Sequence, residues 1–146
     1  MRRLASIRAV LVPLLLTGTL VVAAALPALA QPTGTVRIGP EATLVAKGAA
    51  TQVPARYSCT PETSFADLTV QVTQRVGGNR LAEGVGSTTN LICDNQVHTA
   101  VVTVTATGEN AFRRGVALAR ASLFTCDPFG NCTAAPDSRE ITIVGK

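Results

Sequence analysis

Apolar and polar side chains alternate at every second position over several segments of this 146-residue chain. Between Thr51 and Thr60, one face would carry Val53, Ala55, Tyr57 and Cys59. Period two is the repeat of a strand with one buried face, whereas an amphipathic helix repeats every 3.6 residues. No segment of the chain shows a competing amphipathic helical pattern, so the alternation predicts an all-β fold.

The same alternation predicts strands over residues 68–73, 97–107 and 116–126, and a last strand that carries Ile141 and Ile143 inward. The alanine-rich stretch 116–123 has a helical alternative, but it lies between a glycine and a cysteine-bounded turn, which favours a strand. Clusters of Gly, Asn, Asp and Pro separate these segments. Short strands at this spacing are typical of an antiparallel sandwich or barrel.

Two features qualify the expected core and sheet. Pro54 falls inside a strand and cannot donate to a ladder, so it marks either an edge strand or a bulge. We favour the bulge, because the alternation keeps its phase on both sides. The chain has no Trp, one Tyr and four Phe, about two of which we expect to be buried. Aliphatic residues must therefore fill most of the core, and cross-links become useful.

The N-terminal segment has the pattern of a secretory signal peptide. Arg2, Arg3 and Arg8 precede an apolar run over 9–25, and Ala28-Leu29-Ala30 matches a cleavage site. A retained membrane anchor is the alternative, because about 20 apolar residues can span a bilayer. Pro13, Gly18 and Pro27 favour cleavage. We therefore predict a signal peptide over residues 1–30 and one mature domain over residues 31–146, secreted and free of the membrane.

Cleavage of the signal peptide would lower the net charge that the protein presents to its partners. The full chain has a net charge of +4, and loss of the three signal arginines leaves about +1. A nucleic-acid-binding protein needs a concentrated basic face to displace counterions from phosphate. Only Arg113 and Arg114 are adjacent in the mature chain, so we expect no nucleic-acid partner. The excess of Arg over Lys, with abundant Ala, Gly and Val, points to a GC-rich bacterial source.

Four cysteines allow three pairings. Cys126 and Cys132 bracket a Pro- and Gly-containing turn that returns the chain on itself, so they form the natural short loop. Cys59 and Cys93 then remain, and Cys59 lies on the inward face of its strand. A zinc site is the alternative, but Cys-x₅-Cys is not finger spacing and His98 is the one histidine. We predict two structural disulfides and no metal or cofactor.

No catalytic constellation is evident in the sequence. His98 lies on a predicted strand beside Val97 and Thr99, which favours a solvated or edge-strand histidine over a catalytic base. Gly84-Val85-Gly86-Ser87 lacks the strand–helix setting of a phosphate loop. Asp94-Asn95 and Asp127 with Asn131 are too sparse for a dedicated calcium site and favour turn formation. We therefore predict that the protein is not an enzyme.

The cysteine-bounded turn is the one segment with a functional signal. It comprises Cys126, Asp127, Pro128, Phe129, Gly130, Asn131 and Cys132. An aromatic held at the tip of a stapled loop is preorganised, so that binding a partner costs less ordering entropy. Alternatively, Phe129 folds back and caps the end of the fold. We favour capping and retain residues 127–131 as a candidate recognition loop.

Several motifs carry a resemblance to known proteins. The alternating strands, Gln74-Arg75-Val76-Gly77-Gly78, Ala111-Phe112-Arg113-Arg114-Gly115 and Cys-Asp-x₃-Asn-Cys resemble a group of uncharacterised small secreted actinomycete-type proteins. Tyr57-Ser58-Cys59 is similar to the Tyr-x-Cys of immunoglobulin domains. The mature length and four cysteines are also similar to neocarzinostatin-type apoproteins, which carry an apolar chromophore. These resemblances imply an antiparallel immunoglobulin-like β-sandwich of about seven strands with two disulfides.

Together these observations predict a secreted, non-enzymatic binding or surface-interaction module. Its partner would be an extracellular protein or a small ligand. The alternatives are an apolar-ligand carrier of neocarzinostatin type, which needs a concave apolar cleft, and a protease inhibitor that presents residues 127–131. The shortage of aromatic residues to line a cleft places the carrier second.

Overall fold

The computed structural model describes residues 33–145, which form eight strands and one short 3₁₀ turn. The expected signal peptide lies outside the described residues. The elements in chain order are β1 (Gly34–Ile38), β2 (Glu41–Val45), η1 (Ala46–Gly48), β3 (Ala50–Cys59), β4 (Phe65–Gly77), β5 (Arg80–Thr88), β6 (His98–Ala106), β7 (Gly115–Cys126) and β8 (Cys132–Gly145). Every long alternating segment that the sequence predicted as a strand coincides with one of these strands, with ends that differ by at most one residue for β3 and β6.

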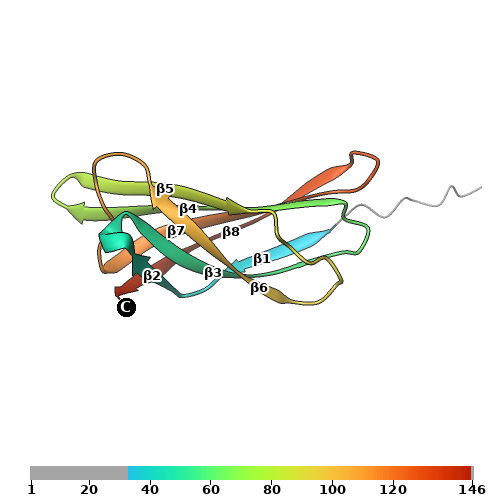
Figure 1. Ribbon diagram of the computed structural model, residues 1–146, viewed down its shortest axis with the longest axis horizontal. Helices are drawn as coiled ribbons and strands as arrows, with labels where there is room; N and C mark the ends of the chain where they lie inside the picture. Colours follow the sequence, from blue (N-terminus) through green and yellow to red (C-terminus); the bar gives the residue numbers. More distant parts are fainter. Residues whose placement is uncertain (1–32, 146) are drawn as a thin grey trace, which may run out of the picture.

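The strands close into a barrel, so the predicted immunoglobulin-like sandwich is wrong. β3 pairs with β6 along one edge and with β1 and β2 along the other, and β2 pairs in parallel with β8. The ring therefore runs through β2, β3, β6, β5, β4, β7 and β8 and returns to β2, while β1 continues the same edge of β3. Figure 1 shows the elongated result. Alternation assigns inner and outer faces, but it does not select each strand's partner.

Small aliphatic side chains fill the barrel, as the composition predicts. Phe112 is 2% exposed and is the one Phe of the four that is buried, whereas about two were expected. The rest of the core is mainly Val, Ala, Leu and Ile, and all eight strands contribute to it, β1 through Ile38 and β2 through Ala42. The barrel interior therefore depends on many small contacts rather than on stacked aromatic rings.

Phe112 closes one end of the barrel. Its backbone N–H donates to the carbonyl oxygen of Gly48 at 2.8 Å. Gly48 has φ +94°, and a side chain there would overlap the carbonyl oxygen of Phe112. The next residue, Arg113, is held by the buried side-chain amide of Gln74. Gln74 Oε1 accepts from Arg113 N–H at 2.8 Å, and Gln74 Nε2 donates to the carbonyl oxygen of Arg113 at 2.7 Å. The segment before β7 is thus fixed across the barrel end.

Gly84 and Gly86 allow β5 and β6 to cross closely. A side chain at Gly84 would overlap the carbonyl oxygen of Thr105, and one at Gly86 would overlap that of Thr103. The two strands share only two paired positions, Gly84 with Ala106 and Val85 with Thr105. The glycines therefore allow the backbones of β5 and β6 to approach each other, a role that glycines within strands often have.

Pro54 is not at a bulge. It lies at the point where the pairing along one edge of β3 passes from β1 to β2. Pairing of β3 with β6 runs without a shift from Ala50 to Tyr57, so the bulge we favoured is absent. The carbonyl oxygen of Pro54 instead accepts from Gly39 N–H at 2.7 Å. Gly39 lies between β1 and β2, where the neighbouring edge is interrupted. The missing N–H of proline therefore falls at a break in the ladder.

Two side chains of β8 complete the closure beside β1. Asp137 Oδ2 accepts from the N–H of Ile38 at 2.8 Å, and Arg139 Nη1 donates to the carbonyl oxygen of Ile38 at 2.7 Å. β1 and β8 are not paired as strands at this point. Side chains thus satisfy backbone groups that a strand would otherwise satisfy.

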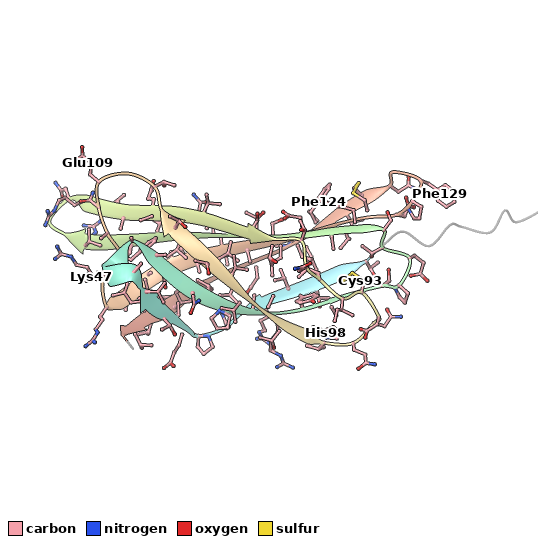
Figure 2. The ribbon with its side chains drawn as sticks, in the orientation of Figure 1. Lys47, Cys93, His98, Glu109, Phe124 and Phe129 are labelled. Atoms are coloured by element: carbon pink, nitrogen blue, oxygen red, sulfur yellow. A yellow bond between two sulfur atoms is a disulfide. The ribbon has the colours of Figure 1, made fainter. Side chains whose placement is uncertain are left out.

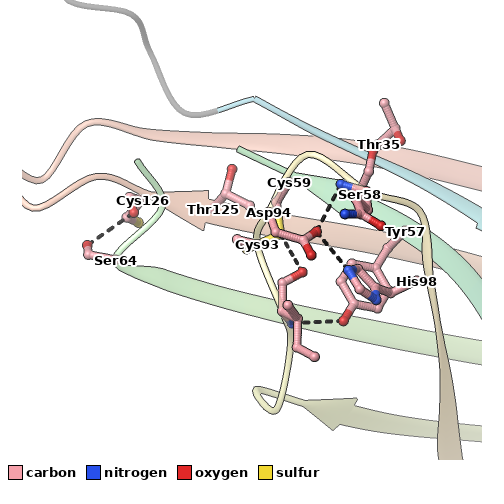
Figure 3. The surroundings of a disulfide bond; sticks show 12 residues. Thr35, Tyr57, Ser58, Cys59, Ser64, Cys93, Asp94, His98, Thr125 and Cys126 are labelled. Carbon is pink, nitrogen blue, oxygen red and sulfur yellow. Dashed lines mark hydrogen bonds and ion pairs between the residues drawn. A yellow bond between two sulfur atoms is a disulfide. The ribbon is translucent and has the colours of Figure 1, made fainter. Parts of the chain in front are cut away.

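Both predicted disulfides are confirmed. Cys59 is joined to Cys93, and Cys126 to Cys132. The first holds the segment between β5 and β6 against β3, where Asn95 N–H also donates to the carbonyl oxygen of Cys59 and Ile92 N–H to the Tyr57 hydroxyl. Figure 3 shows these surroundings. The second joins directly opposed residues of β7 and β8.

We expect the two disulfides to contribute unequally to stability. Cys59→Ala with Cys93→Ala should lower the free energy of unfolding by about 4 kcal/mol, and Cys126→Ala with Cys132→Ala by less than about 3 kcal/mol, because the first pair closes the longer loop. Cys59 is also 2% exposed, so its truncation removes core contacts. Denaturant melts of the two double variants measure the difference. A larger loss from the second pair would contradict this order.

Candidate functional site

The predicted recognition loop is a tight turn at the tip of the β7–β8 hairpin. Gly130 N–H donates to the carbonyl oxygen of Asp127 at 3.2 Å, and Asp127 N–H donates to that of Asn131 at 2.9 Å. Gly130 has φ +85°, a conformation that glycine adopts without strain. Asp-Pro-Phe-Gly follows the residue preferences of a type I turn, with Asp first, Pro second and Gly last. The local sequence therefore favours this turn without the help of tertiary contacts.

Asp127 fixes the loop through its side chain. Its Oδ1 accepts from Phe129 N–H at 2.8 Å and from Asn131 N–H at 2.9 Å, while Oδ2 accepts from the Asn131 side-chain amide at 2.8 Å. The residue is only 7% exposed. These hydrogen bonds, above all that from the Asn131 side chain, lower the pKa of Asp127 although burial opposes them. The predicted turn-forming role of Asp127 with Asn131 is confirmed.

Phe129 points into solvent at the tip of this turn. Its side chain is 80% exposed, so the capping interpretation that we favoured from the sequence is wrong. The reason lies in the turn itself. Asp127 accepts hydrogen bonds from the backbone and side chain of the loop, and the disulfide closes it, so the ring is not needed to hold the turn. Figure 2 shows Phe129 at the far end of the hairpin. An exposed Phe on a rigid frame is available for contact with another molecule.

Two further phenylalanines lie on the outer face of the same hairpin region. Phe124 of β7 is 40% exposed and lies opposite Ala134, and Phe65 of β4 is 49% exposed and lies opposite Cys126. We call Phe65, Phe124, Phe129 and the Cys126–Cys132 disulfide the aromatic surface. Figure 2 shows Phe124 and Phe129 on the projecting β7–β8 hairpin. Sequence reasoning did not single out Phe65 or Phe124, although the inward positions of Leu123 and Thr125 place Phe124 outward.

His98 is a hydrogen-bonded side chain at the start of β6. Its Nε2 lies 2.8 Å from Asp94 Oδ1, and its ring centroid lies 5.8 Å from that of Tyr57. Asp94 Oδ1 also accepts from Gln96 N–H at 2.9 Å, and the hydrogen bond with His98 is the largest cause of the lowered pKa of Asp94. Figure 3 shows this cluster beside the Cys59–Cys93 disulfide. Within residues 33–145, neither contact of His98 is with a Ser or Cys nucleophile.

Two further kinds of feature, metal-binding clusters and membrane-spanning helices, are absent from the described part of the chain. Residues 33–145 contain no group of three or more His, Cys, Asp or Glu side chains arranged to hold a metal ion. Over the same range, no helix of a length and apolarity suited to crossing a bilayer is present.

Comparison with known proteins leaves the family open. No family model matches the chain, and no curated protein matches it. Among solved structures, the periplasmic chaperone SfaE is similar at a TM-score of 0.29 and 10% sequence identity. The match covers 76% of this chain and 56% of that chain, so this chain spans little more than half the length of the chaperone.

The exposure of Phe129 leads to a stability prediction with a matched control. Phe129→Ala should change the free energy of unfolding by less than about 0.5 kcal/mol, because surface truncations rarely do more. Phe112→Ala removes the same atoms from the closed barrel end and should cost about 3–5 kcal/mol. Denaturant melts of both variants measure the contrast. A loss from Phe129→Ala that approaches the Phe112→Ala value would mean that the ring is packed.

The lowered pKa of Asp127 predicts how the loop responds to acid. A carboxyl group with a lower pKa in the folded state stabilises the loop fully above its unfolded pKa, and this contribution disappears as the pH falls through the folded pKa. Carbon NMR should place the titration midpoint below the ordinary value of 3.8. The amide signals of Phe129 and Asn131 should shift with it, and Asp127→Asn should abolish the transition. A midpoint at or above 3.8 would contradict the hydrogen-bond assignment.

Proposed function

We propose that this protein is a secreted, non-enzymatic binding module that contacts an extracellular protein through the aromatic surface. The observation that carries the proposal is the 80% exposure of Phe129 on a turn closed by a disulfide and three Asp127 hydrogen bonds. Aromatic anchors supply a large share of interface energy, and a preorganised loop loses little entropy on binding. Phe65 and Phe124 extend the apolar area along the outer face of β4 and β7.

Secretion is supported by the disulfides and by the N-terminal sequence pattern. Disulfides persist in oxidising compartments and are rare in the reducing cytoplasm. The arginine-led apolar segment with Ala28-Leu29-Ala30 would direct export. A carrier of apolar ligands is less well supported, because the inward side chains of the barrel form one packed and buried cluster.

Site-specific photocrosslinking tests the proposed surface. A photoreactive phenylalanine analogue replaces Phe129 in one variant, and in the control it replaces Val101, which is 58% exposed on β6, a strand that pairs with neither β7 nor β8. Both variants are incubated with medium and cell envelopes of the source organism. We expect a discrete protein adduct at position 129 and none at position 101.

Competition makes the crosslinking result specific. An excess of unlabelled wild-type protein should suppress the adduct at position 129, whereas an equal excess of Phe129→Ala protein should not. Equal adducts at both positions, no adduct at position 129, or equal competition by the two proteins would overturn the proposal. Because Phe129→Ala should retain the fold, a failure to compete reports the loss of the ring rather than unfolding.

A further inference from the structure

Two arginines lie directly opposite each other on the outer face of the barrel, on strands other than those that carry the aromatic surface. Arg37 of β1 pairs in register with Arg56 of β3. Both are exposed, since their strands direct Ile38, Ala55 and Tyr57 inward and the intervening positions outward. Like charges at directly opposed positions of an antiparallel pair destabilise a sheet. The arrangement is therefore unfavourable unless something else neutralises it.

Nothing in the described part of the chain neutralises this pair. Over residues 33–145, neither guanidinium has a hydrogen bond or an ion pair, and the one acid–base contact of this kind there joins His98 to Asp94. The carboxylate of Asp137, which lies beside β1, accepts from the backbone N–H of Ile38. Arg139 provides the contrast, because its guanidinium donates to the carbonyl oxygen of Ile38. Arg37 and Arg56 thus retain their full donor capacity.

A hydroxyl pair and an open depression lie beside the two arginines. Thr35 and Ser58, the next outward pair along the same two strands, are linked through their hydroxyl oxygens at 2.7 Å. In such a pair one hydroxyl donates, so the hydrogen of the other stays available. A depression of about 320 Å³ is lined by Thr35, Val36, Arg37, Arg56, Tyr57 and Val97. It combines two cations and a hydroxyl donor with an apolar wall.

We propose that this depression binds a dianionic phosphate group, either free phosphate or a phosphate monoester. A single arginine fork can satisfy both oxygens of a carboxylate. Two adjacent arginines provide more donors than a carboxylate can accept, whereas a phosphate dianion has three terminal oxygens and a second negative charge. Arg37 and Arg56 would each donate to the phosphate, and the hydroxyl of Thr35, which lines the depression, would complete the set. The site is independent of the proposed protein contact.

Nitrogen–proton NMR of the arginine side chains tests the proposal at pH 8 and low ionic strength. Inorganic phosphate should shift the Nε–H signals of Arg37 and Arg56 with a saturable curve, and acetate at the same ionic strength should not. Arg37→Gln and Arg56→Gln should each weaken phosphate binding at least about tenfold, the effect of losing one charged hydrogen-bonding partner. Arg75→Gln is the matched control, since Arg75 is an exposed strand arginine opposite Leu81.

Thermal melts separate binding from folding. Without phosphate, Arg56→Gln should melt at a higher temperature than wild type, because the like-charge contact is gone. Phosphate should raise the melting temperature of wild type and of Arg75→Gln, but not that of Arg56→Gln. Methyl phosphate distinguishes the source: binding as tight as phosphate identifies an ester, and weaker binding identifies free phosphate. Equal binding of acetate, or undiminished phosphate binding by both Gln variants, would overturn the proposal.

Discussion

Closure of the sheet between β8 and the first two strands is the constraint on which the rest of the structure depends. The edge of β3 is divided between β1 and β2, with Gly39 donating to Pro54 at the break. β2 then turns to pair in parallel with β8, while Asp137 and Arg139 bind the backbone of Ile38. Without this seam, both β3 and β8 would present unpaired edges, which favour aggregation. Hydrogen bonds made by the carbonyl oxygen of Pro54 and by the side chains of Asp137 and Arg139 thus hold the sheet closed.

A closed barrel explains why the core tolerates such small side chains. Seven strands enclose a narrow interior that side chains alone can fill, and Val and Ala on opposing strands suffice. Phe112 closes the end near η1, and Gly84 with Gly86 lets β6 approach β5 without side chains between them. The Cys59–Cys93 disulfide secures the long segment between those two strands. Cross-linking and close backbone contact together compensate for limited apolar burial.

The sequence predicted local properties well and strand partners poorly. The phase of alternation correctly placed Val53, Tyr57 and Cys59 inward, and the turn between Cys126 and Cys132 identified both disulfides. Alternation looks the same in a sandwich and in a barrel, so the parallel contact between β2 and β8 had no local signal. The inward positions of Asp137 and Arg139 follow from extending the phase of Ile141 backwards, but charged residues at such positions look like solvent-facing ones. Partner choice was therefore beyond what the pattern contained.

The same difference between local and tertiary determinants separates Phe112 from Phe129. Phe112 lies in the irregular segment between β6 and β7, where distant residues fix the backbone: Gly48 accepts from Phe112 N–H, and Gln74 binds the backbone of Arg113. Its burial could not be read from neighbours in sequence. Phe129 lies in a turn whose hydrogen bonds are satisfied within residues 127–131, so the ring is not needed for stability. A turn that is complete without its aromatic residue leaves that residue free to serve an external contact.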